Sequence, residues 1–363
     1  MMRRPLRTLL LSSLLSSLLG CSSAPAVIPT PAPEGMPYDT LAEWHFFADP
    51  VAQTPASGVV PYDVVSPLFS DYTVKYRFLY LPPGQKITWH DTDRWEFPVG
   101  AVLIKTFTYP VDARTPSLGR RILETRLLVH EADGWVAHTY EWDAGQTAAS
   151  IKIAGDTIDA TWIDASGATQ HNAYAVPNTN TCKECHGKTG LTSSLGGRTR
   201  QWNRDHDYGK GPENQIDHLA SLGLLDVAPP PVAMRQTLVD PSGSGSASER
   251  GRSYLDANCA HCHGVVGLAA GTAFWLDWDH TDPVSGDPTA WGVCKVPASA
   301  GGGTCGLGFD VVPGHSDQSI VPCRAGTLEN KVAMPPVGHS MVHVEGVALL
   351  KAWIDAMPAQ SCQ

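Results

Sequence analysis

The chain has 363 residues, with 36 acidic and 26 basic side chains and a net charge of −10. Its length allows more than one domain, and its 42% of apolar residues excludes a disordered chain, because that fraction is enough to build packed cores. The negative charge argues against nucleic acid as a partner, since phosphate backbones attract basic surfaces.

The first 20 residues predict an export signal. Three arginines lie within residues 1–7, and residues 9–19 form a Leu/Ser-rich run that is too short for a durable membrane span. Gly20 then precedes Cys21, an arrangement typical of a lipoprotein signal that is cleaved before Cys21, after which Cys21 is lipidated. Ordinary cleavage after a nearby small residue is the alternative.

Removal of this signal would change both the location and the charge of the protein. It takes away three arginines and no acidic residue, which brings the net charge from −10 to −13. We expect the mature protein at the periplasmic face of the bacterial envelope, held in the inner or the outer membrane only by its N-terminal lipid. An acidic surface favours neutral or basic protein partners.

Residues 21–37 contain repeated prolines and predict a tether. The pattern then changes to short β-branched and aromatic runs, separated by Pro, Gly and an Asp133-Gly134 hairpin signal. These runs cover residues 76–81, 86–90, 101–109, 122–130, 135–142 and 151–162. We therefore expect one mostly antiparallel β domain over residues 38–177.

Two five-residue runs follow the pattern CxxCH. The first spans residues 182–186 and the second spans residues 259–263. Two cysteines at this spacing can form thioethers with both vinyl groups of one porphyrin, and the adjoining histidine can bind its iron. Zinc knuckles and redox dithiols share the CxxC spacing, but a zinc ribbon needs its second pair much sooner, and each pair here has its own histidine. The pattern predicts two covalently bound c-type haems.

The predicted site residues are the four cysteines and two histidines of these motifs, together with one methionine. They are Cys182, Cys185, His186, Cys259, Cys262, His263 and Met334. Of these, His186, His263 and Met334 are the expected ligands of iron. Below, the first haem is the one expected on the motif of residues 182–186, and the second haem is the one expected on residues 259–263.

Residues 178–240 predict a small helical haem-binding segment followed by a linker. Residues 215–225 place Ile216, Leu219, Leu222 and Leu225 on one helical face. Prolines at 229–231 and small residues at 241–248 indicate a flexible joint. A final unit, residues 241–363, begins with a helix that leads into the second motif and ends with an amphipathic helix over residues 343–357.

This last unit resembles a class I cytochrome c domain. The likeness rests on the helix that runs into CxxCH, the Met334-Pro335-Pro336 turn and the aromatic-bearing closing helix. The resemblance implies that His263 binds one face of the second iron and Met334 the other, with Met341 in reserve. Two prolines that stiffen the loop behind Met334 favour this role over core packing.

Residues 38–363 as a whole resemble a family of bacterial dihaem c-type cytochromes with a β-rich N-terminal domain. The likeness is carried by residues 60–63, 67–72, 97–100, 105–107 and 203–205. It implies an α+β multidomain fold, in which an N-terminal, mostly antiparallel β domain is followed by helical cytochrome c-type haem domains. It also implies electron transfer at the cell envelope, with other redox proteins as partners.

Four further cysteines lie near the C-terminus, which is an even number consistent with an oxidising compartment. They are Cys294, Cys305, Cys323 and Cys362. We favour Cys294 with Cys305 and Cys323 with Cys362, although three pairings are possible.

The second axial ligand of the first iron decides the functional class. Its candidates are His171, His206, His218 and Met234, each of which also has an ordinary structural explanation. Two tightly ligated irons would make an electron carrier. An open first iron would instead allow a peroxidase-like oxidoreductase that takes peroxide. A third possibility is a partner-docking β domain whose haems only relay electrons.

Overall fold

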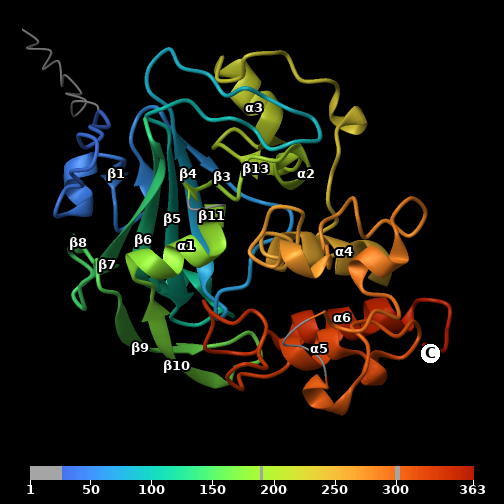
Figure 1. The fold of residues 1–363 in the computed structure, drawn as a ribbon. Coiled ribbons are helices and arrows are strands. Elements are labelled where there is room, and N and C mark those ends of the chain that lie inside the picture. The colour runs from blue at the N-terminus through green and yellow to red at the C-terminus, as the bar shows by residue number, and fades with distance from the viewer. Residues whose placement is uncertain (1–26, 189–190, 299–302) are drawn as a thin grey trace, which may run out of the picture.

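The computed structural model describes residues 27–188, 191–298 and 303–363. Its largest element is a six-stranded antiparallel sheet in the order β3-β4-β5-β6-β7-β8 (Figure 1). The strands are β3 (Val59–Tyr62), β4 (Val74–Tyr80), β5 (Val102–Pro110), β6 (Arg120–Glu131), β7 (Gly134–Trp142) and β8 (Ala149–Ile151). The predicted Asp133-Gly134 turn is confirmed, since Glu131 and Gly134 are paired across it.

Both faces of this sheet are covered, which explains why its strands are rich in apolar residues. On one face, Phe78, Val102 and Ile104 pack against Trp44 and Phe46 from the segment that precedes the sheet. That segment contains the short pair β1 (Phe47–Asp49) and β2 (Thr54–Pro55). On the opposite face, alternate residues of the same strands are buried with the apolar residues of a later part of the chain.

A second hairpin extends the β-rich part of the molecule. It consists of β9 (Asp156–Ile163) and β10 (Thr169–Val176) and lies below the sheet in Figure 1. Its alternating residues Ile158, Trp162 and Tyr174 pack on Phe107 and Tyr109 of β5. The predicted run of residues 151–162 is thus divided between β8 and β9.

The remaining helices and short strands are distributed over the second half of the chain. The helices are α1 (Thr179–His186), α2 (Thr199–Trp202), α3 (Gln215–Ser221), α4 (Ala247–Asn258), α5 (Ile320–Ala325) and α6 (Val344–Asp355). The short pairs are β11 (Gly187–Lys188) with β12 (Leu191–Thr192) and β13 (Asp205–Asp207) with β14 (Pro212–Asn214). In Figure 1, α1 lies across the front of the sheet, and α4, α5 and α6 form a separate group beside it.

The two longer predicted helices are present as α4 and α6. Ser246 caps α4 in a reciprocal hydrogen-bond pair with Glu249. In α6, residues Leu350, Trp353 and Ile354 are buried, and the helix packs against α4. In α3, Ile216 and Leu219 are buried as predicted, whereas Leu222 is exposed. These residues of α3 join the core on the second face of the sheet.

The predicted fold class was wrong. An N-terminal β domain is present, but the structure as a whole is β-rich, with 26% strand and 22% helix, and it has little helical content of the cytochrome kind. The reason is visible between α4 and α6, where Gly- and Pro-rich sequence forms turns, single-turn 3-10 helices and the six-residue α5. The division of the chain into the predicted domains stays a prediction.

The four C-terminal cysteines form two disulfides, but not in the favoured pairing. Cys294 is bonded to Cys362, and Cys305 to Cys323, with Cα–Cα distances of 5.0 and 6.7 Å. The chain beyond α6 returns to residue 313, where the backbone N–H of Gln360 donates to the Pro313 carbonyl, and this brings Cys362 to Cys294. Long-range packing of this kind, rather than loop length, selected the partners.

Two sequence predictions lie outside the described residues. These are the export signal of residues 1–20 with the lipidated Cys21, and the first part of the tether of residues 21–37. Within the described ranges, no helix has both the length and the apolar character needed to span a bilayer.

Candidate functional site

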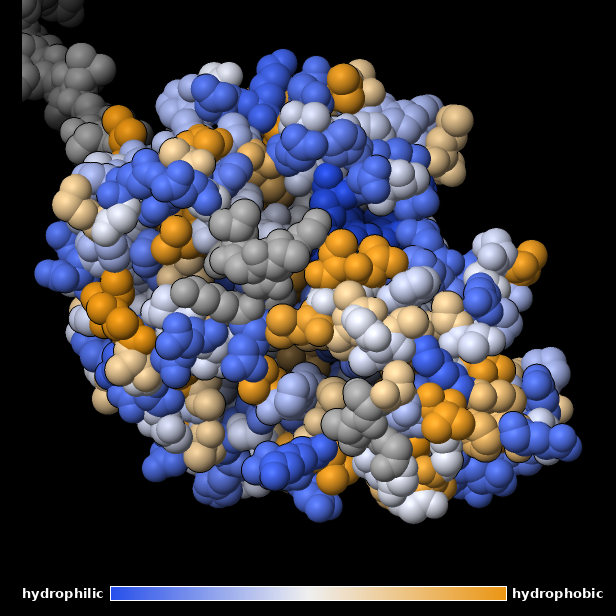
Figure 2. All heavy atoms as spheres, in the orientation of Figure 1, coloured by the Kyte–Doolittle hydropathy of each residue, from blue (hydrophilic) through white to orange (hydrophobic). Residues whose placement is uncertain are grey.

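A cavity of about 670 Å³ lies between the second face of the sheet, α1 and the group formed by α4 and α6. Figure 2 shows apolar residues gathered around a hollow in this region of the surface. Every predicted site residue whose side chain is described lines the cavity, from both CxxCH motifs and from the Met334 loop. The side chain of Cys185 lies outside the described part. Segments that are far apart in sequence therefore converge on one space.

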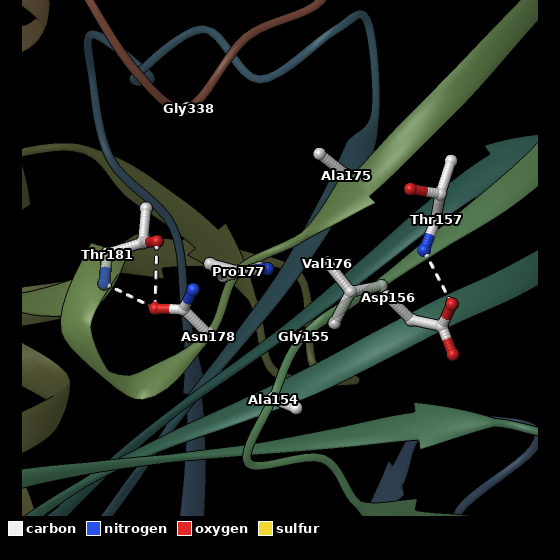
Figure 3. Close-up of a pocket in the computed structure, with 10 residues that line it drawn as sticks. All are labelled: Ala154, Gly155, Asp156, Thr157, Ala175, Val176, Pro177, Asn178, Thr181 and Gly338. Carbon is white, nitrogen blue, oxygen red and sulfur yellow. Dashed lines mark hydrogen bonds between the residues drawn. The ribbon is translucent and has the colours of Figure 1, made fainter.

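The first motif lies on α1, which places Cys182 and His186 one helical turn apart on the same face. Asn178 precedes the helix, and its side-chain oxygen accepts a hydrogen bond from the Thr181 N–H at 2.9 Å. Figure 3 shows this hydrogen bond in a close-up of a smaller pocket that Asn178 and Thr181 help to line. The cap therefore fixes the start of the helix that carries the motif.

The imidazole of His186 is held in the form that a metal ligand requires. Its Nδ1 lies 2.9 Å from the carbonyl oxygen of Ser193. Because a carbonyl only accepts, the proton lies on Nδ1 and the lone pair is on Nε2. Burial lowers the pKa of His186 to about 4, so the ring is neutral at physiological pH. Metal-bound histidines are commonly held by such a second hydrogen bond.

The second motif follows directly from the end of α4. The backbone N–H groups of Cys262 and His263 both donate to the Cys259 carbonyl, at 3.1 and 2.8 Å, which forms a tight turn. The ring of His263 meets that of Phe274 edge-on, with centroids 5.1 Å apart. Burial lowers the pKa of His263 and outweighs the nearby Phe274 carbonyl, while its Nδ1 is buried without a hydrogen bond of normal geometry.

The thiols of the motifs differ from those of redox dithiols. Burial raises the pKa of Cys259 to about 12 and also raises the pKa of Cys182. Redox-active CxxC pairs instead need a lowered thiol pKa, because the thiolate is the nucleophile. The surroundings therefore agree with apolar attachment points rather than with disulfide exchange.

The loop from Met334 to Ser340 connects the surroundings of the two motifs. Met334 lines the cavity, and its backbone N–H donates to the Arg324 carbonyl at 3.0 Å at the end of α5. Farther along, the Ser340 hydroxyl donates to Asp71 at 2.8 Å. Between them, Gly338 lies opposite Asn178 and Thr181 at the start of α1 (Figure 3). One loop therefore borders both ends of the cavity.

A row of cations crosses the sheet on the wall of the cavity. Arg77, Lys105 and Arg126 are direct cross-strand neighbours on β4, β5 and β6. Arg77 is paired with Asp63 at 2.7 Å, and the Nε of Arg126 donates to Glu124 at 2.9 Å. Like charges placed directly opposite each other destabilise a sheet, so such a row attracts an anionic group.

Lys105 is the cation of this row whose charge is not matched. Among the described residues it makes no ion pair, and its Nζ lies 5.0 Å from the centre of the Phe107 ring. Burial and the adjacent Arg77 hold the pKa of Lys105 well below its ordinary value. A carboxylate that entered the cavity would relieve this cost. The two propionates of a haem are carboxylates of the required kind.

The candidates for the second axial ligand of the first iron do not line this cavity. His218 is bound to Glu213 at 2.7 Å and stacks on Tyr208. His171 lies at an exposed position of β10, beside Thr161. The side chain of Met234 is 72% exposed. His206 lies next to Tyr208, on β13. Local contacts outside the cavity therefore account for His171, His206 and His218.

Sequence reasoning missed three histidines that do line the cavity, one of which is His343, just before α6. His261 lies between the cysteines of the second motif, and His339 lies in the Met334 loop. His261 has a buried Nδ1 without a hydrogen-bond partner, and His339 has two such nitrogens. The signal for His261 was its place inside the motif, where the two residues between the cysteines are not specified. For His339, its spacing of five residues from Met334 was the only signal.

No protein-family model matches the chain, and neither the curated proteins nor the solved structures contain a match. The resemblance to the bacterial dihaem c-type cytochrome family and to class I cytochrome c domains was therefore wrong as an identification. The fold is mostly sheet, with six α-helices among the described residues. The same part of the chain holds no group of three or more His, Cys, Asp or Glu that could bind a metal ion. The haem prediction therefore rests on the residues and spacing of the two CxxCH motifs, without support from that family.

Proposed function

We propose that the protein binds two c-type haems covalently and transfers electrons at the bacterial cell envelope. The observation that carries this proposal is the convergence of both CxxCH motifs on one apolar cavity with a cationic wall. Leu103 and Leu128 of the sheet, and Phe274 and Leu350 of the C-terminal part, offer the apolar surfaces that a porphyrin face needs.

Each group in the cavity has a role in this proposal. The motif cysteines would hold each haem through thioethers to its vinyl groups, and His186 and His263 would each offer a buried imidazole to an iron. When bound, each haem iron accepts and releases one electron by changing between Fe(III) and Fe(II). Lys105, on the wall of the same cavity, would offer a cation to a propionate, and the apolar walls would limit the access of water.

The shared cavity favours an electron carrier. Because both motifs open on the same cavity, electrons could pass between the two bound haems within it. The export signal expected from residues 1–20 supports a site outside the cytoplasm, and the acidic charge favours redox protein partners with basic or neutral surfaces. A lipid on Cys21 would keep the protein at the membrane surface.

The peroxidase-like alternative needs a first iron with an open coordination position. Steady-state turnover of hydrogen peroxide by the holoprotein distinguishes it from the carrier. A carrier gives two low-spin haems and no peroxide turnover above that of free haem. The docking alternative predicts that residues 38–177 retain partner binding without either haem.

The test of the proposal is the haem content of the protein after expression with a c-type maturation system in a bacterial periplasm. We expect the denatured wild-type chain to keep two haems by intact mass and by haem-dependent peroxidase staining. The pair C182A and C185A leaves one haem, as does the pair C259A and C262A. As a matched control, C305A with C323A removes two cysteines and leaves both haems. A wild-type chain without covalent haem would overturn the proposal.

A further inference from the structure

The segment of residues 66–72, between β3 and β4, joins the sheet to the part of the chain that carries the second motif. The backbone N–H of Phe69 donates to the side-chain oxygen of Asn258 at 2.7 Å. The side-chain amide of Asn258 donates in turn to the Tyr254 carbonyl of α4 at 3.0 Å. Asn258 directly precedes Cys259, so these contacts fix the chain where the second motif begins.

On its other side, the same segment binds the loop that contains Met334. One oxygen of the Asp71 carboxylate accepts the backbone N–H groups of Ser340 and Met341, each at 2.9 Å. The other oxygen accepts the Ser340 hydroxyl at 2.8 Å. Asp71 is only 3% exposed, and burial strengthens hydrogen bonds to a charged acceptor. A single buried carboxylate therefore holds the C-terminal end of the loop.

The backbone at this contact is strained. Asp71 and Tyr72 have φ angles of 51° and 60°, in the left-handed region that residues with a side chain rarely adopt. Such conformations persist only where the surrounding structure holds them, and they are concentrated at functional sites. In this conformation Asp71 faces Ser340, and the Tyr72 hydroxyl accepts the Val344 N–H at 3.1 Å. Two adjacent residues thus hold the chain from the loop to the start of α6.

The loop is fixed at its other end by α5. The backbone N–H of Met334 donates to the Arg324 carbonyl at 3.0 Å. Met334, at this first anchor, lines the cavity, whereas Met341, at the second, packs beside the core of Phe107 and Trp162. The two anchors therefore leave one methionine at the cavity and keep the other against the sheet.

We propose that Asp71 is a positioning residue for the ligation of the second iron. It holds Ser340 through the same segment that holds Asn258, and this keeps the Met334 loop in place relative to the second motif. The assignment rests on the proposed function, because it requires a haem on that motif with Met334 as its ligand. A methionine ligand raises the potential of a haem. The sheet part of the chain thus controls the potential of a haem that is attached to another part.

Two substitutions of Asp71 test the hydrogen bonds that it accepts. D71A removes both acceptors and leaves the N–H groups of Ser340 and Met341 without them. D71N keeps one oxygen for these N–H groups, and its amide can donate to the Ser340 hydroxyl. That hydroxyl can then donate to the side-chain oxygen of Asn172, which lies 2.8 Å away. D71N is therefore the conservative variant, and it should preserve the anchor.

Asp355, at the end of α6, offers a matched control. One of its carboxylate oxygens accepts the Ser316 N–H and the other accepts the Ser316 hydroxyl, both at 2.9 Å. Asp355 is exposed, and the described lining of the cavity includes neither residue. D355A thus removes the same kind of contact without a change at the Met334 loop.

The test compares these variants as oxidised full-length holoproteins, with covalent haem counted by intact mass on the same samples. In D71A we expect two covalent haems, loss of the histidine–methionine signal in electron paramagnetic resonance, and a lower potential of the second haem. Added imidazole should bind to the second iron of D71A and not to that of the wild type. Hydrogen–deuterium exchange in residues 334–341 should become faster in D71A. D71N and D355A should keep the spectrum and the potential of the wild type.

Three results would overturn the positioning role and leave the proposed function in place. The first is a D71A chain with two haems that keeps the histidine–methionine signal and the potential. The second is a loss of the signal in D355A equal to that in D71A, which would show a general effect of stability. The third is a wild-type second haem without methionine ligation. A wild-type chain without covalent haem overturns the proposed function and the positioning role together.

If D71A yields no folded holoprotein, S340A decides the question. This variant removes the hydroxyl that binds Asp71 and keeps the backbone N–H. Weaker ligation by Met334, seen as binding of added imidazole to the second iron, supports the positioning role. A second iron that excludes imidazole as in the wild type, in an S340A chain with faster exchange in residues 334–341, overturns it.

Discussion

The same five-residue pattern occurs in two regions of the molecule that are built differently. The first motif lies on α1 against a sheet, where His186 donates to the Ser193 carbonyl and a row of cations forms the adjacent wall. The second follows α4 in a loop-rich region closed by two disulfides, where His263 contacts Phe274 and Met334 lies nearby in the same cavity. The motif fixes how a haem would attach, whereas the surroundings determine its ligands and charge.

This difference gives the two sites separate chemical properties. The first region offers the imidazole of His186 and the unmatched positive charge of Lys105, and the second offers a thioether and the buried carboxylate of Asp310. Axial ligands and nearby charge are the main determinants of haem potential. The two haems should therefore respond to different substitutions, and each prediction below tests whether the regions are independent.

The largest effect is expected from Met334→Ala. In our proposal the Met334 thioether is the distal ligand of the second iron, so its loss should change half of the haem from low to high spin. Electron paramagnetic resonance of the oxidised protein measures this change. Met341→Ala is the control, because Met341 packs beside the core of Phe107 and Trp162. A spectrum altered by Met341→Ala and not by Met334→Ala would reverse this assignment.

Gly251→Ala tests how far the second region depends on the crossing of α4 and α6. A Cβ at Gly251 would lie 2.6 Å from the Cβ of Trp353, which is too close for the two helices as they are packed. We expect a loss of about 1–3 kcal/mol in the free energy of unfolding, measured by denaturant titration. Gly271→Ala is the control, since a Cβ there meets open space. Equal stability of the two variants would contradict the packing described.

Asp310→Asn tests the charge of the second region through the pH dependence of stability. Burial raises the pKa of Asp310 to about 6, against the opposing effect of Lys295 and Arg324. The folded protein thus binds this proton more tightly than the unfolded chain, so the wild type loses stability as the pH rises from about 4 to about 6. The variant lacks this loss.

The stability of Asp310→Asn relative to the wild type should therefore increase across that window, by on the order of 2 kcal/mol. Denaturant titrations at several pH values measure the difference. A difference that stays constant between pH 4 and pH 7 would show that Asp310 titrates as an ordinary exposed carboxyl group.

Lys105→Met has the smallest expected effect, and it concerns the first region alone. Removal of a cation beside the first haem disfavours the reduced state, so its potential should fall by on the order of 50 mV. Potentiometric titration followed in the visible spectrum resolves the two haems. Lys351→Met, on the exposed side of α6, is the control. An equal shift of both haems would show that the regions share one electrostatic environment.

The sequence predicted the elements whose patterns were strong. The runs of β-branched and aromatic residues gave β4 to β7, and the apolar stripe of residues 343–357 gave α6, while α4 was expected as the helix that leads into the second motif. The strand β10 was missed because two of its exposed positions are alanines, which are depleted in strands, and its buried positions include Asn172. The helical haem domains did not form because Gly and Pro interrupt the chain between α4 and α6. Helix propensities considered residue by residue did not show that these interruptions leave only short helices in that part of the chain.

For the site, the motif residues were predictable because the CxxCH spacing alone indicates haem attachment. Their convergence on one cavity was not, since it depends on how distant segments pack. The cationic row of Arg77, Lys105 and Arg126 requires the strand register, and the disulfide pairs require the return of the chain after α6. His261 was overlooked because a position inside a motif is usually assigned to that motif.

The central claim is that each CxxCH motif carries one haem. Peptide mapping by mass spectrometry of the purified holoprotein tests it most directly, because it locates the modification on the chain. The account predicts one haem on the peptide that contains residues 182–186 and one on the peptide that contains residues 259–263. Recovery of either peptide with unmodified or disulfide-bonded cysteines, after expression with a working maturation system, would contradict it.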